Sequence, residues 1–415
     1  MIESTIKEVE KEIEKQLKRA NEISEENQRR VLHAFRNQRV SDSHFNPTTG
    51  YGYDDLGRDV LEAVYAEVFG GEDALVRPQI VSGTHAITTA LFGMLRPGEE
   101  LLYITGKPYD TLEEVVGSRG STDNGSLKDF GIGYSAVELT GNGMIDWNEV
   151  KQSIKENTKV IAIQRSKGYH ERPSFSIDEI KEMVQFVKNI DKHLHVFVDN
   201  CYGEFVETKE PLHVGADLIA GSLIKNPGGG IVRTGGYIAG KQELVEKCAN
   251  RLTAPGLGKE TGASLGMLQE MFQGLFLAPH IVGEAVKGAV FTSLFLEKTG
   301  FETKPDYQAK RTDLIQSVNF ATAEQMVAFC QAVQQASPVN SYVIPYPSSM
   351  PGYDSEVIMA AGTFIQGASL ELTADGPIRP PYTAYVQGGL TYAHVKIAVT
   401  EAVKSLEQKG FLPKM

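Results

Sequence analysis

The sequence predicts an α/β fold with a mainly parallel central sheet and a smaller C-terminal α/β domain. Two observations support this prediction. Short apolar runs without polar alternation, at 159–163 and 196–198, are typical of strands buried on both faces. Amphipathic helical patterns separate these runs, and helices placed between strands cover both faces of a parallel sheet. Ligands of such folds bind at the carboxyl ends of the strands, so residues that directly follow a strand are candidates for a site.

The segment 1–57 is predicted to form helix followed by a loop. Ile6, Val9, Ile13 and Leu17 recur at spacings of three and four among Glu and Lys, which indicates an amphipathic helix rather than the apolar centre of a targeting peptide. Residues 40–57 are rich in Ser, Asn, Pro, Gly and Tyr and are predicted to be a loop.

Helical and strand patterns alternate over 58–288, which predicts one large domain. Strands are expected at 79–81, 100–105, 159–163 and 196–198, and helices at 59–69, 84–95, 111–116 and 147–154. Ser176-Ile-Asp-Glu179 is a capping box before an apolar stripe and predicts a further helix start. Residues 289–415 carry a shorter α/β pattern, with a Pro-, Gly- and Ser-rich stretch at 345–353, and are expected to form the small domain.

The composition narrows the class of protein. The chain has 415 residues, of which 41% are hydrophobic and 23% charged, as expected for a globular protein with a large core. Its net charge of −12 argues against nucleic acid or an anionic membrane as the main partner. The cysteines Cys201, Cys248 and Cys330 are far apart and form no metal-ligand pattern, which fits a reducing compartment. No run approaches the ~20 apolar residues that span a bilayer, so we expect a cytoplasmic protein.

Lys225 is the strongest functional candidate. It follows Ser222 and precedes Asn-Pro-Gly-Gly-Gly, and Asp199 ends an apolar strand upstream. This order is typical of enzymes that hold pyridoxal 5′-phosphate: the lysine amine forms an imine with the cofactor, the aspartate keeps the pyridine nitrogen protonated, and the serine faces the phosphate. A surface lysine is the alternative. The apolar residues at 218–220 and 223–224 instead favour a sheltered amine, whose pKa burial would lower.

The segment Ser82-Gly83-Thr84-His85 lies between a predicted strand and a predicted helix. Gly83 lets the backbone approach a ligand closely, and the helix start offers unpaired N–H groups to an anion. Taken alone, the segment could be a simple helix N-cap. Because Lys225 follows downstream, we assign this segment to the cofactor phosphate.

Two residues compete for the place against the cofactor ring. Tyr109 follows the strand that ends at Thr105, and its phenol could also pass a proton to a leaving group. A half-packed loop tyrosine is its alternative role. His85 is the competing ring-stacking residue, with a helix-start histidine as its alternative. Cys201, next to Asp199-Asn200, is interpreted as a packed thiol, with a place in the site left open.

Arginines are the candidates for the substrate carboxylate, because a planar guanidinium can donate two parallel hydrogen bonds to it. Arg379, in Arg-Pro-Pro-Tyr, is the first candidate. Arg165 belongs to the polar segment 164–169 that follows a predicted strand, and this segment could approach the cofactor or the substrate carboxylate. A solvated basic loop is the alternative for that segment.

The early loop contributes Tyr51, Tyr53 and Arg58. Loops on a rigid scaffold often carry function. We predict that these residues reach the cofactor phosphate of a neighbouring subunit.

With these residues in view, the chain resembles the cystathionine β/γ-lyase and methionine γ-lyase group of pyridoxal-phosphate enzymes, and within it the aluminium-resistance or methionine-γ-lyase-like branch. The resemblance covers nearly the whole chain. The group's Ser-x-Thr-Lys is Ser222-Leu-Ile-Lys225 here. The segments that carry the resemblance are Asn46-Pro-Thr-Thr-Gly-Tyr51-Gly-Tyr53, Ser82-Gly-Thr-His, Gln164-Arg-Ser-Lys-Gly-Tyr169, Val198-Asp-Asn200, Lys225-Asn-Pro-Gly-Gly-Gly230, Pro380-Pro-Tyr382 and Gln387-Gly-Gly-Leu390.

The resemblance implies an aminotransferase-like fold of type I with pyridoxal 5′-phosphate as cofactor. No metal site is visible in the sequence. The resemblance further implies a carbon–sulfur lyase that acts on cystathionine or a methionine-like amino acid by β- or γ-elimination. It also implies a homodimer or homotetramer with the site at the subunit interface. Because a fold does not fix the reaction, an aminotransferase, a decarboxylase, an aldolase and a cofactor-holding protein without turnover remain alternatives.

Overall fold

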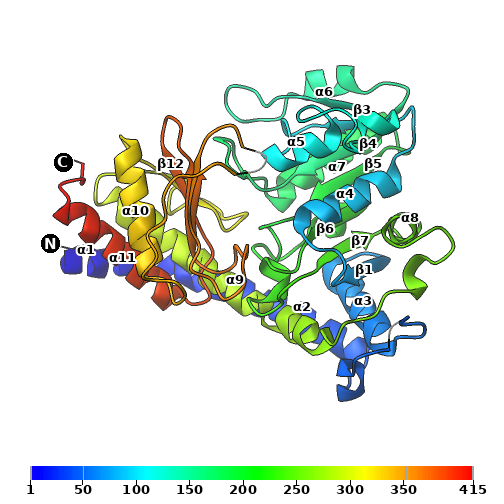
Figure 1. The fold of residues 1–415 in the computed structure, drawn as a ribbon, viewed down its shortest axis with the longest axis horizontal. Coiled ribbons are helices and arrows are strands. Elements are labelled where there is room, and N and C mark those ends of the chain that lie inside the picture. The colour runs from blue at the N-terminus through cyan, green and yellow to red at the C-terminus, as the bar shows by residue number, and fades with distance from the viewer. Residues whose placement is uncertain (1, 50, 351–352, 414–415) are drawn as a thin grey trace.

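The computed structural model describes residues 2–49, 51–350 and 353–413. Gly50 of the predicted early loop, and residues 351–352 of the predicted Pro-rich stretch, lie outside the described residues. Figure 1 shows two lobes joined by the long helix α9, with α1 (Ile2–Glu12) on the side of the small lobe.

A seven-stranded sheet in the order β1-β7-β6-β5-β4-β2-β3 forms the centre of the large lobe. The neighbouring pairs β3–β2, β2–β4, β4–β5 and β5–β6 are parallel, and β7 is antiparallel to both of its neighbours, β1 and β6. The prediction of a mainly parallel sheet is confirmed. The strands are β1 (Asp73–Arg77), β2 (Glu100–Tyr103), β3 (Gly133–Ala136), β4 (Thr158–Gln164), β5 (His195–Asp199), β6 (Leu218–Ser222) and β7 (Gly236–Gly240).

Helices cover both faces of this sheet, as the alternating pattern predicted. They are α3 (Leu56–Phe69), α4 (Gly83–Met94), α5 (Asp110–Val116), α6 (Trp147–Ser153), α7 (Ile177–Ile190) and α8 (Gln242–Leu252). Helix α4 packs against α8 on one face. On the other face, α3 and α7 share a second apolar core with the strands.

The strand predicted at 79–81 was wrong. The strand at this position is β1, which pairs with β7 from Asp73 opposite Gly240 to Arg77 opposite Gly236. Pro78 follows it and has no N–H to donate to a sheet ladder, so pairing stops there and the chain turns toward α4. The apolar run 74–76 is short and lies next to Gly70-Gly71, which concealed it in the sequence.

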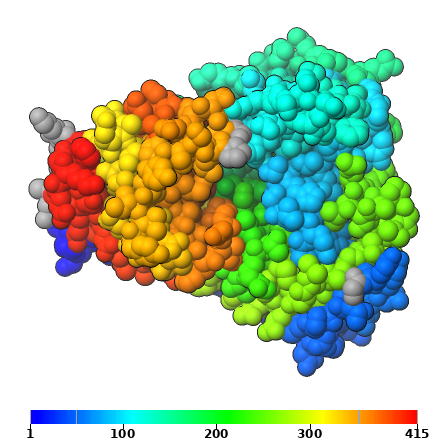
Figure 2. Space-filling view, viewed as in Figure 1, coloured from blue at the N-terminus to red at the C-terminus, as the bar shows by residue number. Residues whose placement is uncertain are grey.

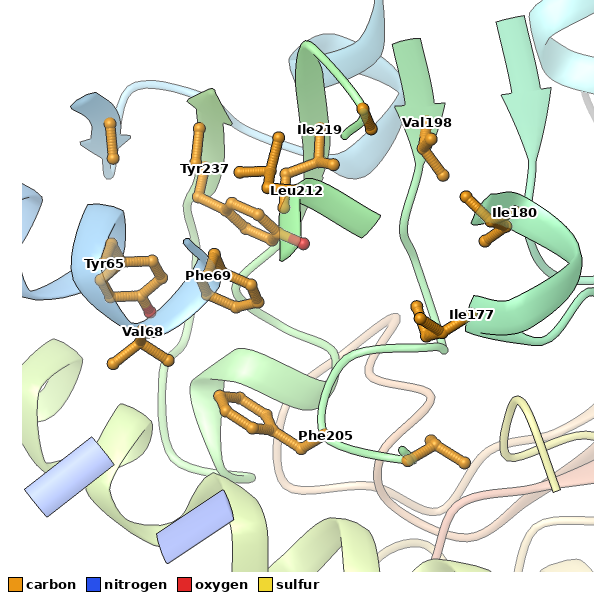
Figure 3. Close-up of a cluster of buried hydrophobic side chains, with 14 of the residues drawn as sticks. Tyr65, Val68, Phe69, Ile177, Ile180, Val198, Phe205, Leu212, Ile219 and Tyr237 are labelled. Atoms are coloured by element: carbon orange, nitrogen blue, oxygen red, sulfur yellow. The ribbon is translucent and has the colours of Figure 1, made fainter. Parts of the chain in front are cut away.

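Figure 3 shows the core on the face of the sheet that α3 and α7 cover. The rings of Phe69 in α3 and Tyr237 in β7 are stacked, with centroids 5.0 Å apart. Val198 and Ile219, from β5 and β6, are fully buried in the same cluster. The strands that carry the candidate residues are therefore packed on both sides, which fixes the position of their carboxyl ends.

The small lobe is a five-stranded antiparallel sheet in the order β10-β11-β12-β9-β8. It is the smaller α/β unit that the sequence predicted, and α10 (Ala323–Gln335) and α11 (Tyr392–Gln408) share its core. Its strands are β8 (Glu302–Lys304), β9 (Gln316–Asn319), β10 (Val357–Ala360), β11 (Thr373–Pro377) and β12 (Thr383–Gln387).

Helix α9 (Leu268–Glu297) belongs to both lobes. It packs against α2 (Glu14–Asn37) and α3 of the large lobe and against α11 and β8 of the small lobe. By length and composition this helix could cross a bilayer, which the sequence analysis did not predict. However, 67% of its most apolar 18-residue stretch is buried inside the protein. It is therefore a core helix. The predicted boundary after residue 288 lies within it, and that division of the chain stays a prediction.

The predicted capping box at the start of α7 is present. The Ser176 hydroxyl accepts a hydrogen bond from Glu179 N at 3.3 Å, and Glu179 Oε2 accepts one from Ser176 N at 2.7 Å. Changing Ser176→Ala is expected to lower the free energy of unfolding by about 1 kcal/mol, measured by urea titration. Ser176→Thr keeps the hydroxyl and should lose much less. Equal losses in the two variants would contradict a capping role.

Candidate active site

A cavity of about 290 Å³ lies at the carboxyl ends of β4, β5 and β6. Figure 2 shows a hollow between the orange part of the small lobe and the cyan and blue parts of the large lobe, with green segments at its floor. Residues of both lobes line the cavity: Ser82, Gly83, Thr84, Tyr109, Asp110, Gln164, Ser166, Gly168, Tyr169, His170, Asp199, Cys201, Tyr202, Ser222, Ile224 and Lys225 from the large lobe, and Tyr353 and Gly367 from the small lobe.

Lys225 follows β6, and its Nζ lies 3.9 Å from the centroid of the Tyr202 ring. Burial by itself lowers the pKa of this ammonium, but acidic groups around it, including Cys201 and Asp199, raise the pKa overall. The lowered pKa that the sequence predicted was therefore wrong. The apolar neighbours along the chain were visible in the sequence, whereas the acidic side chains come from other elements.

Asp199 ends β5 and is almost fully buried. Its Oδ1 accepts a hydrogen bond from Cys201 N at 3.1 Å. Burial raises the pKa of this carboxyl, while Lys225 and the Cys201 amide lower it. A cation beside Asp199 would stabilise the anion further, and a protonated pyridine nitrogen is such a cation.

The start of α4 faces the same cavity. The Ser82 hydroxyl accepts a hydrogen bond from His85 N at 3.0 Å and caps the helix. The first intrahelical bond runs from Ala86 N to Ser82 O, so the amides of Gly83 and Thr84 have no acceptor within the helix. A Cβ added at Gly83 would lie 3.3 Å from Cys201 Sγ, so a side chain here would fill part of the cavity.

These residues fit the phosphate of pyridoxal 5′-phosphate. The Ser222 hydroxyl is buried and, among the described residues, has no hydrogen-bond partner. A buried hydroxyl without a partner costs free energy, which a bound acceptor would offset. Ser222 and the free amides at the start of α4 line one cavity, and such a donor set suits an anion.

Tyr109 is the ring-stacking candidate that lines the cavity. Its hydroxyl lies 2.8 Å from Thr84 Oγ1, and its backbone N donates to Gln164 Oε1 at 2.8 Å. Burial, and then Asp199, raise the pKa of its phenol, so this group stays protonated at neutral pH and can donate a proton. The competing residue, His85, accepts a hydrogen bond from Val81 N at 3.2 Å and does not line the cavity.

Arg165 does not line the cavity, contrary to its predicted role in substrate binding. It is fully buried behind β5 and donates to Asn200 Oδ1 at 2.8 Å. It also forms ion pairs with Glu207 at 3.2 Å and Glu210 at 3.4 Å. Asn200 and these carboxylates occupy the guanidinium, and Arg165 is not among the residues that line the cavity. Its position after a strand was therefore misleading.

Four further candidates lie outside the active-site cavity of their own chain. The rings of Tyr51 and Tyr53 stack on each other with centroids 5.0 Å apart, and 65% and 54% of these residues are exposed. Arg58 is buried and donates to Gly52 O at 2.5 Å, so it holds the loop that carries them. Arg379 lines a cavity of about 230 Å³ that shares Tyr169 with the active-site cavity.

Several cavity residues were not predicted. Tyr202 lies on the turn after β5 with a left-handed φ of 71°, and it places its ring beneath the Lys225 amine. It directly follows Asp199-Asn200-Cys201, so the expectation that site residues follow the end of a strand could have found it. Tyr353 and Gly367 come from the small lobe, and no local pattern relates them to the site. Cys201 packs against Gly83 and also lines the cavity, so it is both a packed thiol and a residue of the site.

Tyr169 and Asp375 join the two lobes beside the cavity. The Tyr169 hydroxyl donates to Asp375 Oδ1 at 2.5 Å, and Gln387 Nε2 donates to Asp375 Oδ2 at 3.1 Å. Burial raises the pKa of Asp375 from 3.8 to about 6, although these hydrogen bonds oppose the rise. The folded protein therefore binds this proton more tightly than the unfolded chain does.

This raised pKa predicts a pH dependence of stability. Ionisation of Asp375 opposes folding, so the wild type should lose up to about 3 kcal/mol relative to Asp375→Asn as the pH rises from about 4 to about 6, with no further loss above that. Urea unfolding of both proteins across this range measures the difference, in which effects of other groups cancel. A difference that does not change with pH would contradict the raised pKa.

The parallel sheet, the lysine after β6 and the aspartate at the end of β5 define the class: this is the fold of type I pyridoxal-phosphate enzymes. The pyridoxal-5′-phosphate-dependent protein YhfS of Escherichia coli shares it, with a TM-score of 0.61, 16% identity and coverage of 93% of this chain and 97% of that chain. More narrowly, the chain belongs to the methionine gamma-lyase family, whose model matches residues 2–407.

Similar proteins place the chain within this family. It is 66% identical to the uncharacterized protein YnbB of Bacillus subtilis, over 99% of this chain and 98% of that protein. The carbon–sulfur lyase involved in aluminum resistance from Clostridium novyi has a TM-score of 0.94 and 49% identity, over 98% of this chain and 96% of that chain. L-methionine gamma-lyase of Pseudomonas putida is 32% identical over 50% of this chain and 45% of its own length. The resemblance seen in the sequence is confirmed.

Proposed function

We propose that this protein is a pyridoxal-phosphate-dependent carbon–sulfur lyase that cleaves a sulfur-containing amino acid by β- or γ-elimination. One observation carries the proposal: the Lys225 amine, the Asp199 carboxylate and the unpartnered Ser222 hydroxyl line a single cavity of about 290 Å³. Membership of the methionine gamma-lyase family and the likeness to a carbon–sulfur lyase support it.

The cofactor supplies an aldehyde that links to an amine and a ring that accepts the electrons left on the substrate α-carbon. The chain supplies the groups that hold it. Lys225 Nζ would form the covalent link, the Asp199 carboxylate would pair with the ring nitrogen, and Tyr109 would pack along the ring. Ser222 and the amides of Gly83 and Thr84 would donate to the phosphate.

The same residues move the protons of an elimination. With the cofactor bound, Lys225 Nζ would be the base that takes the proton from the α-carbon once the substrate amine has replaced it. Tyr109 is protonated at neutral pH, so its hydroxyl gives a proton to the departing sulfur, and the Thr84 hydroxyl at 2.8 Å holds it in position. The products are a thiol, ammonia and a keto acid, with one water consumed when the imine released by the elimination is hydrolysed.

Arg379 is our candidate for the substrate carboxylate. It comes from the small lobe and lies in the adjoining cavity, which Tyr169 and His170 share with the active-site cavity. A carboxylate held there would orient the substrate between the two lobes. Arg379→Leu should raise KM for the amino acid more than it lowers kcat.

We also infer that the protein works in the cytoplasm as a homodimer or homotetramer, with Tyr51 and Tyr53 of one chain reaching the site of the next. Their exposed rings support this arrangement, because a chain on its own would leave two adjacent aromatic side chains in water.

The test is product analysis of the purified protein with its cofactor bound. Cystathionine and methionine are incubated separately, and thiol, keto acid and ammonia are measured. Release of all three in equal amounts is expected. Exchange of the amine with an added keto acid, without thiol release, would instead identify an aminotransferase and overturn the proposal.

Tyr109→Phe tests the assigned proton donor. This variant keeps the ring and removes the hydroxyl, so kcat should fall by roughly 10²-fold or more while the cofactor stays bound. Tyr134→Phe is a matched control, because this tyrosine is also partly buried but does not line the cavity. Its kcat should be unchanged. Equal rates for Tyr109→Phe and the wild type would remove Tyr109 from the mechanism.

A further inference from the structure

A second cavity lies away from the active site, between α2 and α9, and has a volume of about 890 Å³. Figure 1 shows these two helices side by side along the base of the molecule. The turn at 206–208 and the segment 308–311 also line this cleft. Among the described residues, none lines both this cleft and the active-site cavity, but Lys310 and Arg311 of the cleft also line a third cavity of about 450 Å³ that shares His170 with the active site.

Arg311 is the unusual residue of this cleft. Only 8% of it is exposed, yet its Nε and Nη1 have no hydrogen-bond partner among the described residues. Its Nη2 makes one long contact, 3.5 Å from Ala289 O. Burial lowers the pKa of the guanidinium to about 10, while Asp313, Asp306 and Glu297 oppose this, so the group keeps its charge at neutral pH. Buried charges are normally paired, because an unpaired one is costly.

The side chains that line the cleft carry one more positive than negative charge: Lys15, Arg19, Lys310 and Arg311 against Glu22, Glu26 and Glu207. Lys15 and Arg19 on α2 bring further positive charge to the cleft, in a chain with a net charge of −12. Of the glutamates that line it, Glu207 is already held by Arg165 at 3.2 Å and by Lys310 at 2.5 Å. Among the described residues, no carboxylate accepts a hydrogen bond from Arg311.

The walls of the cleft are partly apolar. Val286 and Val290 of α9 and Val206 of the turn after β5 are buried residues that line it, and Ile23 of α2 completes this surface. A volume of this size lies within the range of small-molecule sites, which combine apolar walls with a few polar groups that fix orientation.

We propose that this cleft binds a small molecule with an apolar body and a carboxylate or phosphate head, the head on Arg311 and the body against Val286, Val290 and Ile23. The free donors of a planar guanidinium match the paired oxygens of either head. This inference rests on the cleft alone and does not depend on the proposed lyase activity.

Calorimetric titration of the protein with its cofactor bound tests this inference, because the cofactor then fills the phosphate site of the active-site cavity. Hexanoate and hexyl phosphate are the probes, with acetate and 1-hexanol as comparisons. Saturable binding of one hexanoate or hexyl phosphate per chain is expected, at least about tenfold tighter than acetate because the longer chain buries more methylene groups. The tighter of the two probes identifies the preferred head group. Absence of saturable binding by both, or equal binding of 1-hexanol, would overturn the proposal.

Two variants assign the binding to this cleft. Arg311→Met keeps the length of the side chain and removes the charge, and it should weaken binding of the preferred probe by roughly 10- to 100-fold. Ile23→Glu leaves Arg311 intact and places a negative charge on the opposite wall, and it should also weaken binding. In Lys225→Ala, which changes the active-site cavity, binding should persist. Unchanged affinity in both cleft variants, or loss in Lys225→Ala, would place the ligand elsewhere.

Discussion

Replacing Lys225 with alanine is expected to abolish the visible absorbance of the covalently held cofactor and to lower the rate of thiol release by at least about a thousandfold. The amine that forms the link and takes the α-proton belongs to this one side chain, and it lies against the Tyr202 ring in an enclosed cavity. No other lysine lines that cavity among the described residues. The measurements are an absorbance spectrum and a kinetic assay with saturating cofactor.

Two controls separate chemistry from folding. Lys241→Ala removes a lysine whose side chain is 44% exposed and pairs with Asp217, so the spectrum and the rate should not change. Borohydride reduction of the wild type should fix the cofactor to the peptide that contains Lys225, identified by mass. A wild-type spectrum in Lys225→Ala would refute the assignment.

Replacing Arg165 with alanine is expected to lower the free energy of unfolding by up to about 3–5 kcal/mol, because it removes one of the two cations that pair each of two buried carboxylates. Among the described residues, Glu207 then keeps only Lys310 and Glu210 keeps only Arg30. Arg165 is fully buried and pairs with Glu207 and Glu210, of which Glu210 is fully buried as well. It also holds Asn200, the residue after Asp199, through a 2.8 Å hydrogen bond. Urea unfolding of the variant and the wild type measures the loss.

The matched comparison is Arg29→Ala. Arg29 also pairs with a glutamate, Glu25, but the two side chains are 71% and 66% exposed, so its loss should cost less than about 1 kcal/mol. If Arg165→Ala instead kept its stability and only raised KM for the amino acid, the substrate-binding role predicted from the sequence would be restored.

The fold was predictable where its signal is local. Continuous apolar runs at β4 and β5 and the Ser176 capping box identified the parallel sheet and its helices. Strands β3, β6 and β7 were not predicted. Strand β3 is partly exposed at the edge of the sheet, and β6 and β7 are short runs that contain or are flanked by Gly and pair with each other. The error at 79–81 had the same origin, since pairing with β7, rather than local composition, selects residues 73–77 as the strand.

The site was predictable to the extent that it lies at strand ends. Lys225, Asp199 and Ser222 follow or end neighbouring strands, and the topology brings them to one cavity. Arg165 follows a strand too, but its side chain turns away because buried glutamates lie behind β5. The direction of a side chain, the approach of Tyr353 from the other lobe and the raised pKa of Lys225 all depend on contacts distant in sequence. The position of a residue after a strand carries no information about these contacts.

Helix α9 has a consequence for the order of events during synthesis. Its first half covers α2, which leaves the ribosome long before it, and its second half supports strands that are made later. The helix α1, made first of all, pairs through Glu10 and Glu3 with Lys396 and Lys404 of α11, which is made last. Domains of many proteins finish folding one after another as they emerge. Here the core of the small lobe contains residues of α1, α9 and α11, so this lobe can close only after the final segment has been made, and in ribosome-bound chains it should stay sensitive to proteases until release.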